Sequence, residues 1–389
     1  MNKNIYCGRG NRIPYADYMA LINLSFGFTT PETEFLGLLP KCYREEYRPQ
    51  DQNYVVTEDG VLTAAVGAYD HEIVVCGRRL PCRGIGNVAV HPDHRSKGYM
   101  KLAMNKSLED MIADGIVLST LGGRRQRYQY FGFDKAGPAY SFSISRDNIR
   151  HTFGDFSAPF TARIVEDPTD SVLDDILRIT EGKPFAPVRP RETYLDIANT
   201  WKAKLVVFHD PAEGNRFAGY CIIAGGNTMT ELRTERVEDL TKLLRTVFAS
   251  LNEGFSVLIP AYETEYLRIL SPIAEGMSIQ CSMMYNVLRY EAAIDAFLAL
   301  KLTYADLPDG ELTLLIHGFA RDERLRITVK EGKHTIEKLS EDAPVEIELT
   351  HLQATELLFS PVSGLRETQS YLVRSWFPLP IFMYHADEV

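Results

Sequence analysis

The sequence VAVHPDHRSKGYM, residues 88–100, decides the fold of this chain. The apolar run at 84–90 predicts a β-strand, and apolar residues recur at helical spacing after Gly98, which predicts an amphipathic helix. A loop between a strand and a helix presents successive backbone N–H groups to an anion. Gly98 lets the backbone approach closely, and Arg95 and Lys97 add positive charge. The stretch therefore predicts a pyrophosphate site; the alternative is an ordinary helix start.

The rest of the first segment alternates helices with strands. Helical spacing predicts a helix over 15–24 and a shorter one over 34–39 that ends at Pro40. Alternating apolar residues between turns predict the strands 54–57, 62–68, 73–76 and 80–82, and a further strand at 116–120 follows the amphipathic helix. Such alternation predicts an α/β fold.

The second segment repeats this order without the loop. Strands are predicted at 161–165, 205–209, 217–223 and 229–232, followed by a helix at 237–251 and a strand at 255–259. The residues before this helix, RTER at 233–236, contain no glycine, so a second copy of the fold would lack the anion site. The pattern changes again near residue 287, and we expect three domains, 1–155, 156–286 and 287–389. In the last one, a helix over 291–300 precedes strands at 311–316, 324–329 and 345–349 and helices near 352–358 and 367–373.

The composition limits the partners of the protein. The chain has 389 residues, with 42 basic and 52 acidic side chains and a net charge of -10, which argues against sequence-independent binding of nucleic acid. We find no signal-peptide core and no apolar run of about 20 residues, so we expect a cytoplasmic protein without a membrane partner. The six cysteines and nine histidines show no metal-ligand spacing, and we expect no metal.

The loop resembles the acetyl-CoA motif of the GNAT N-acetyltransferases, whose pattern is Q/R-x-x-G-x-G/A. Met100 stands where that pattern ends in Gly or Ala. In that family the preceding strand pairs with pantetheine. The resemblance implies acetyl-CoA as co-substrate, held by Val88, Ala89, Val90, Arg95, Ser96, Lys97, Gly98, Tyr99, Met100 and Lys101.

The sequence YQYFGF, residues 128–133, is similar to the Y-x-x-F-G-Y/F element of the Eis-type (enhanced intracellular survival) acetyltransferases. Those proteins combine a catalytic GNAT domain, a degenerate second GNAT domain and a C-terminal domain like sterol-carrier protein. The resemblance implies α/β (α+β) architecture with mixed, mainly antiparallel sheets, and a homo-oligomer, expected to be a hexamer. The segment GGRRQR, residues 122–127, is more basic than in the aminoglycoside-modifying members.

The resemblance also implies two proton-transfer groups. The acid that protonates the departing sulfur is Tyr128, with Tyr130 as the competing tyrosine, and the base is the terminal carboxylate of Val389. Without the resemblance, aromatic packing would explain the tyrosines, and a frayed tail would explain the terminus. The predicted acceptor pocket contains Phe26, Phe28 and Glu388, with Asp387 as a further lining carboxylate.

These features together predict an N-acetyltransferase that transfers an acetyl group from acetyl-CoA to a primary amine of an aminoglycoside-, polyamine- or lysine-like small molecule. Two alternatives remain open. One is a non-catalytic sensor of acyl-CoA or lipid, and the other is an acetyltransferase of protein lysines or N-termini.

Overall fold

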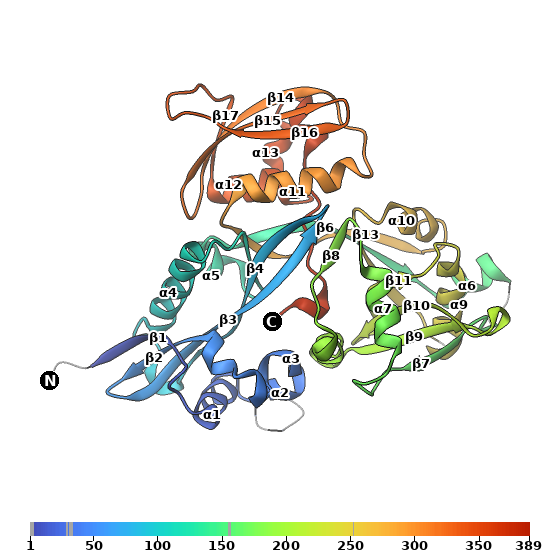
Figure 1. Ribbon diagram of the computed structural model, residues 1–389, viewed down its shortest axis with the longest axis horizontal. Helices are drawn as coiled ribbons and strands as arrows, with labels where there is room; N and C mark the ends of the chain where they lie inside the picture. Colours follow the sequence, from blue (N-terminus) through green and yellow to red (C-terminus); the bar gives the residue numbers. More distant parts are fainter. Residues whose placement is uncertain (1–3, 29, 31–33, 155–156, 252) are drawn as a thin grey trace.

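The computed structural model describes residues 4–28, 30, 34–154, 157–251 and 253–389 (Figure 1). In these residues most of the strands form one large mixed sheet, and four others form a second sheet near the C-terminus. Helices lie against both sheets, so the predicted mixed α/β fold is confirmed.

The strands of the large sheet come from residues 5–287. Its strands lie in the spatial order β1 (Ile5–Arg9), β2 (Asn53–Glu58), β3 (Val61–Val75), β4 (Arg78–Val90), β5 (Leu118–Leu121), β13 (Gly276–Val287), β6 (Asp134–Ile144), β12 (Phe255–Pro260), β11 (Thr228–Thr234), β10 (Arg216–Ala224), β9 (Lys204–Asp210) and β7 (Thr161–Ile164), and β8 (Phe185–Pro187) pairs with β3.

The large sheet has a first half, built mainly from residues 5–144, and a second half, built mainly from residues 161–287, and the two halves exchange strands. β13, which comes late in the chain, lies between β5 and β6 and pairs with both in antiparallel register, so that Met284 faces Leu121 on one side and Lys135 on the other. β6 in turn pairs with β12, where Phe142 faces Val257. Each half is therefore completed by a strand from the other half, and the sheet has no break between them.

Helices cover both faces of the first half because side chains alternate across each strand. Tyr54 and Val56 of β2 pack with α4 (Tyr99–Ala113), whereas Val55 between them packs with α1 (Tyr15–Phe26). The short helices α2 (Phe35–Leu38), α3 (Pro40–Tyr43), α5 (Arg125–Tyr128) and α6 (Arg146–Phe153) follow along the chain. Pro40 does not merely end a helix as predicted: it starts α3, because proline is favourable in the first helical turn.

The second half has the same two-sided cover. α9 (Asp239–Leu251) and α7 (Val172–Thr180) pack on separate apolar clusters of β9 and β10, and the shorter α8 (Tyr194–Ala198) and α10 (Thr264–Leu270) complete it. In each half a strand, loop and helix lead into a parallel neighbour, β4 to β5 and β11 to β12.

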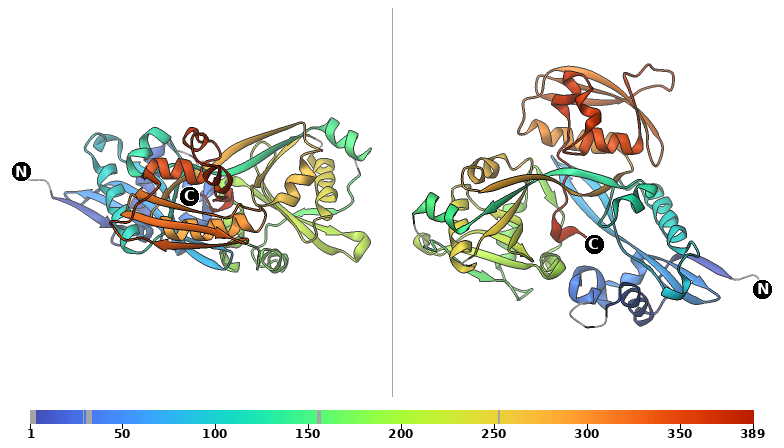
Figure 2. Two further views of the ribbon diagram at one scale, coloured as in Figure 1. Left: turned by 90° about the horizontal axis from the view of Figure 1, so that it is seen from above. Right: turned by 180° about the vertical axis from the view of Figure 1, so that it is seen from behind.

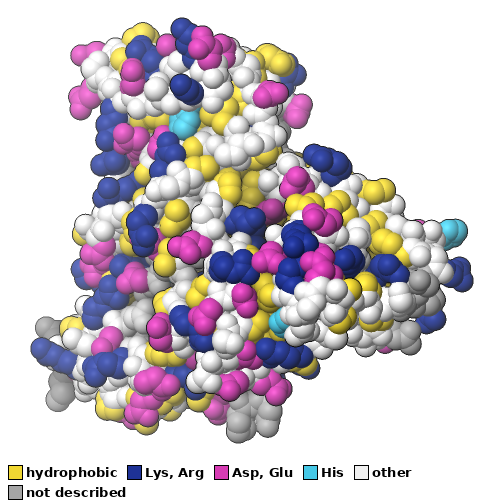
Figure 3. All heavy atoms as spheres, turned by 45° about the vertical axis from the view of Figure 1, so that its right-hand side comes forward, with side chains coloured by type: hydrophobic (Ala, Val, Ile, Leu, Met, Phe, Trp, Pro, Cys, Tyr) yellow, Lys and Arg dark blue, Asp and Glu magenta, His cyan; other side chains and the backbone are white. Residues whose placement is uncertain are grey.

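The C-terminal part lies beside the junction of the two halves of the large sheet, near β6 and β13 (Figures 1 and 2). Its sheet has the order β16 (Lys333–Lys338), β15 (Asp322–Lys330), β14 (Gly310–His317) and β17 (Ile347–Thr350), with helices α11 (Tyr290–Leu302), α12 (His351–Phe359), α13 (Gly364–Glu367) and α14 (Tyr371–Trp376). One apolar cluster joins this part to the ends of β3 and β4. Basic and acidic side chains are interspersed on the face shown in Figure 3, so the net negative charge is not gathered there.

One buried lysine binds three backbone carbonyls at the point where the chain leaves this part, and we call this arrangement the Lys301 clasp. The ammonium of Lys301 in α11 donates to the carbonyl oxygens of Ser375, Trp376 and Pro378 at 3.1, 2.9 and 3.1 Å. These three carbonyls lie where α14 ends and the tail begins. The clasp therefore fixes the direction in which residues 377–389 leave the domain.

We predict that Lys301→Met lowers the free energy of unfolding by about 1–3 kcal/mol, because buried carbonyls would lose their donor. Urea denaturation followed by circular dichroism measures this change. Lys338→Met is the control: Lys338 pairs with Glu291 but its side chain is 61% exposed, and such pairs contribute at most about 1 kcal/mol. Equal stability of both variants and the wild type would show that the hydrogen bonds of Lys301 do not stabilise the protein.

Candidate active site

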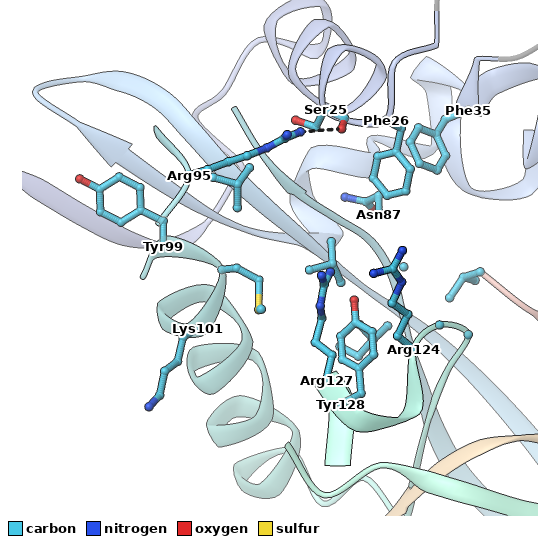
Figure 4. A pocket seen from close by; sticks show the side chains of 18 of the residues that line it. Ser25, Phe26, Phe35, Asn87, Arg95, Tyr99, Lys101, Arg124, Arg127 and Tyr128 are labelled. Carbon is cyan, nitrogen blue, oxygen red and sulfur yellow. Dashed lines mark hydrogen bonds between the residues drawn. The ribbon is translucent and has the colours of Figure 1, made fainter. Parts of the chain in front are cut away.

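A cavity of about 920 Å³ opens between the first half of the large sheet and the end of the chain (Figure 4). Its walls come from α1, α2, β4, the start of α4, α5 and the C-terminal residues. Of the predicted site residues, those that line it are Phe26, Val88, Val90, Arg95, Ser96, Gly98, Tyr99, Met100, Lys101, Tyr128, Glu388 and Val389.

The predicted anion loop forms one end of the cavity. Ser96 and Gly98 have φ values of 64° and 82°, so the loop folds back on itself before α4 starts at Tyr99. Among the described residues no side chain caps α4, and its first turn contains no acidic residue. Its terminal N–H groups are therefore available to an anion.

A buried carboxylate holds this loop against the sheet. Oε2 of Glu58 in β2 lies 2.9 Å from Lys97 Nζ and 2.9 Å from His94 Nδ1. Lys97 thus points to Glu58 and is not a lining residue, although the sequence predicts it as a phosphate contact. The nearby Arg95 lines the cavity, and its guanidinium donates to the carbonyl of Ser25 at 3.3 Å.

β4 has an unpaired edge inside the cavity. Its pairing with β5 covers only residues 82–85, and in the described chain the next residues of β4 pair with β3 alone. The register with β3 shifts there: Asn87 and Val88 lie opposite the single residue Val66, which is a β-bulge. Val88 and Val90 line the cavity, whereas Ala89 is buried on the other face against α1.

A buried polar network holds the bulge in place. Asn87 has a φ of 33°, which is rare for a residue with a side chain. Its Oδ1 accepts hydrogen bonds from Tyr43 Oη at 2.8 Å and Tyr69 Oη at 3.0 Å, and its Nδ2 donates to Asn53 Oδ1 at 2.8 Å. Such a fully bonded buried network offsets the local backbone strain.

Tyr128 extends into the middle of the cavity from the end of α5 (Figure 4). It is buried, and this burial raises the pKa of its hydroxyl above the ordinary tyrosine value, although Arg127 beside it acts in the opposite direction. The phenol is therefore protonated at neutral pH. The alternative tyrosine, Tyr130, is 63% exposed, and Lys101 lies over its ring at 4.5 Å. Of the two tyrosines, Tyr128 alone lines the cavity.

The last residue of the chain lies against β4. Two glycines of this strand make the space: a Cβ on Gly84 would lie 2.6 Å from Val389 Cγ2, and one on Gly86 would lie 3.2 Å from the Val389 carboxyl carbon. Tyr128 and Val389, predicted from distant parts of the sequence, thus line one cavity.

Buried ion pairs hold the tail that carries Val389. The guanidinium of Arg189, which is 7% exposed, contacts Asp387 at 2.8 and 2.9 Å and Glu231 of β11 at 2.7 and 3.0 Å. Burial would raise the pKa of Asp387, but Arg189 lowers it overall, so this carboxyl is ionised. Lys41 and Thr200 donate to the carbonyl of Ala386 at 2.5 and 3.1 Å.

The remaining wall of the cavity is aromatic. Phe26 and Phe35 meet edge to face with ring centroids 4.9 Å apart, and Phe28, which is not a lining residue, packs against both. Trp201 of the second half also lines the cavity, with a φ of 56°. Trp201 was not predictable as a site residue, because nothing near it in the sequence indicates contact with the first half.

Two further lining side chains, Arg124 and Arg127, come from the basic segment before Tyr128. Asp387, predicted as a lining carboxylate, instead pairs with Arg189 and borders a neighbouring cavity. Within the described ranges, no group of three His, Cys, Asp or Glu side chains could hold a metal ion. None of the helices described is long and apolar enough to cross a bilayer.

Comparison with known proteins gives a family match in the first part of the chain. Residues 14–136 match the family model "Acetyltransferase (GNAT) domain", which confirms the resemblance of this part to the GNAT acetyltransferases. No curated protein matches the chain.

Solved structures share the fold over most of the chain. A GCN5-related N-acetyltransferase from Anabaena variabilis has a TM-score of 0.68 at 14% identity and covers 98% of both chains. One from Kribbella flavida has a TM-score of 0.63 at 18% identity, covering 90% of this chain and 86% of its own. Eis1 from Mycobacterium abscessus has a TM-score of 0.60 at 13% identity and covers 98% of both chains. At such identities the likeness establishes the fold alone.

We predict that Gly84→Ala displaces the C-terminus, because its Cβ would overlap the side chain of Val389. Overpacking costs about 1–3 kcal/mol, which enlarges the undocked population of the tail about 5- to 150-fold. Release of Val389 by a carboxypeptidase, followed by mass spectrometry, should accelerate accordingly. Gly276→Ala is the control, since a Cβ there meets nothing within 4 Å. Equal release rates for both variants would show that the terminus does not dock on β4.

Proposed function

We propose that the protein is an Eis-like N-acetyltransferase that transfers the acetyl group of acetyl-CoA directly to a primary amine of a small molecule. One observation carries the proposal. The anion loop, the unpaired edge of β4, the protonated Tyr128 and the end of the chain all border a single cavity.

The residues present fit acetyl-CoA. The uncapped N-terminus of α4 and the guanidinium of Arg95 would bind its pyrophosphate. The unpaired edge at Val88 and Val90 would hydrogen-bond the amides of its pantetheine arm, as a neighbouring strand would. The co-substrate supplies an acetyl group activated as a thioester.

Two residues would move the protons of the transfer. The terminal carboxylate of Val389 would accept one proton from the ammonium group of the acceptor, and the neutral nitrogen would then form a bond to the acetyl carbon as the carbon–sulfur bond breaks. Tyr128 donates its proton to the departing sulfur, and its raised pKa keeps that proton available at neutral pH. The second proton that the nitrogen loses on becoming an amide would replace the one that Tyr128 gives up. Phe26 and Glu388 would hold the acceptor.

The second half would serve as a support and not as a second site. At the position of the anion loop it contains Glu235 and the buried Asp239, both paired with Arg216 at 3.0 Å. Carboxylates at the start of α9 disfavour a phosphate. We therefore propose a catalytic GNAT domain at 1–155, a degenerate one at 156–286 and a sterol-carrier-like domain at 287–389 that delivers the terminus. A cytoplasmic location and a hexameric assembly are further parts of the proposal.

The alternatives are a sensor that binds acyl-CoA without turnover and an acetyltransferase of protein lysines or N-termini. Release of CoA thiol from acetyl-CoA, measured with a panel of aminoglycosides, polyamines, amino acids and lysine peptides, separates them. Release with small amines supports the proposal. Tight CoA binding with no release for any amine would indicate the sensor, and release with peptides alone would indicate the protein acetyltransferase.

We predict that Tyr128→Phe lowers kcat by about two orders of magnitude, because the departing thiolate loses its proton donor. The affinity for acetyl-CoA should stay within about twofold, since the aromatic ring remains in place. Tyr130→Phe is the matched control: Tyr130 is exposed and does not line the cavity, so this change should leave kcat unchanged. If both variants retain full kcat, Tyr128 is not the acid.

We also predict that two alanines added after Val389 abolish amine-dependent thiol release while acetyl-CoA still binds. The extension moves the terminal carboxylate away from Gly86 and leaves a neutral amide in its place. An equal extension before Met1 is the control, and calorimetry of acetyl-CoA binding reports on the fold. Full activity of the C-terminally extended protein would exclude the terminal carboxylate as the base.

A further inference from the structure

Two guanidinium groups in the cavity have no carboxylate partner. Arg124 and Arg127 both line it and, within the described part of the chain, neither forms an ion pair. Arg125 between them behaves differently: it turns away and donates to Asp134, at 3.0 Å for its Nη2. The third lining arginine, Arg95, donates to the carbonyl of Ser25 at the anion loop and likewise forms no ion pair among the described residues. Arg124 and Arg127 are therefore two further positive charges in the cavity without an anionic partner, which calls for a ligand with a negative charge.

Their position separates them from the anion loop. In Figure 4, the guanidinium groups of Arg124 and Arg127 flank the hydroxyl of Tyr128 and point toward Asn87 and Phe26. Arg95 and Tyr99, at the start of α4, lie on the opposite side of the cavity. The two arginines therefore face the end at which the acetyl group meets its acceptor.

The cavity also carries negative charge, and the carboxyl carbon of Val389 lies beside Gly86, the residue before Asn87. Glu388 and the terminal carboxylate of Val389 line the cavity, and His385 holds Glu388 at 3.1 Å. The pocket thus offers a pair of anions and a pair of cations around an aromatic wall. A ligand that satisfies both pairs contains an ammonium group and an anionic group in one small molecule.

We propose that the acceptor is an amine that carries a carboxylate, the class to which free amino acids belong, and that Arg124 and Arg127 bind this carboxylate. This inference rests on the proposed acetyltransferase function and narrows its acceptor. Arginine binds carboxylates through paired hydrogen bonds, which fixes the orientation of the ligand as well as its affinity. A polyamine or an aminoglycoside would leave both guanidinium groups without an anionic partner and would place further positive charge beside them.

The test compares amines that differ only in the carboxylate, namely lysine with cadaverine and phenylalanine with phenethylamine. We expect kcat/KM for thiol release to be about tenfold or more higher for the amino acid of each pair, since one lost charge-assisted interaction corresponds to about 1.5–3 kcal/mol. Arg124→Gln and Arg127→Gln should each reduce this preference through KM. Arg268→Gln, an exposed arginine on α10, should retain it. Equal kcat/KM within each pair would overturn the proposal.

A second measurement tests whether the two arginines bind the co-substrate instead of the acceptor. Calorimetry gives the Kd of CoA and of 3′-dephospho-CoA for the wild type and both variants. We expect each variant to bind CoA within about twofold of the wild type. A loss of about tenfold for CoA that disappears for 3′-dephospho-CoA would assign the arginines to the 3′-phosphate and contradict the proposal.

The outcome remains decisive if the protein does not turn over. Saturation-transfer NMR on the CoA complex compares binding of lysine with binding of cadaverine. Preferential binding of lysine, lost in Arg124→Gln and Arg127→Gln, supports the anionic subsite even without thiol release. In that case the proposed catalysis fails and the subsite stands. Equal binding of both amines, with or without turnover, refutes the subsite.

Discussion

The arrangement of the site depends on one buried ion pair network, in which Arg189 contacts both Asp387 and Glu231. A buried charge is costly without a partner, so each carboxylate fixes the guanidinium and the guanidinium fixes the tail. Replacement of such a network by apolar side chains is often neutral for stability, so its value here is positional. It determines that the tail from the C-terminal domain passes the second half and ends on β4 of the first. Three regions of the chain that share few local signals thereby form one cavity.

The bulge in β4 is a second constraint, and the first half holds it without help from the tail. Tyr43, Tyr69 and Asn53 satisfy the side chain of Asn87 from three different elements. Because the backbone at Asn87 departs from regular pairing, β4 separates from β5 beyond Ile85 and exposes an edge of the sheet. The cavity therefore combines a rigid strand edge with a chain end that is held by the contacts of Ala386 and Asp387.

The parts of the structure that were predictable from the sequence are those with a local cause. The loop 91–98 and the helix after it follow from glycine, charge and spacing within short windows. Tyr128 was proposed only through the resemblance of residues 128–133 to a known element, because spacing alone would explain it by aromatic packing; the family match covers both regions. The exchange of β6 and β13 was not predictable, because strand pairing across more than 100 residues leaves no periodic signal. The positions of Trp201 and Arg189 depend on the same kind of long-range packing, so they were not predictable either. Gly84 and Gly86 were visible as small residues in a strand, but only the structure shows that the chain end occupies their space.

The strand exchange has a consequence for the order of synthesis. While the first half emerges from the ribosome, the space between β5 and β6 has no strand, since β13 is made only after the whole second half. The first half therefore cannot complete its sheet as an independent unit, because the facing edges of β5 and β6 stay unpaired until residues 276–287 are made. Val389, which lines the cavity, is made later still. A chain that stops before residue 276 lacks a strand between β5 and β6, and one that stops between residues 288 and 388 lacks Val389 in the cavity.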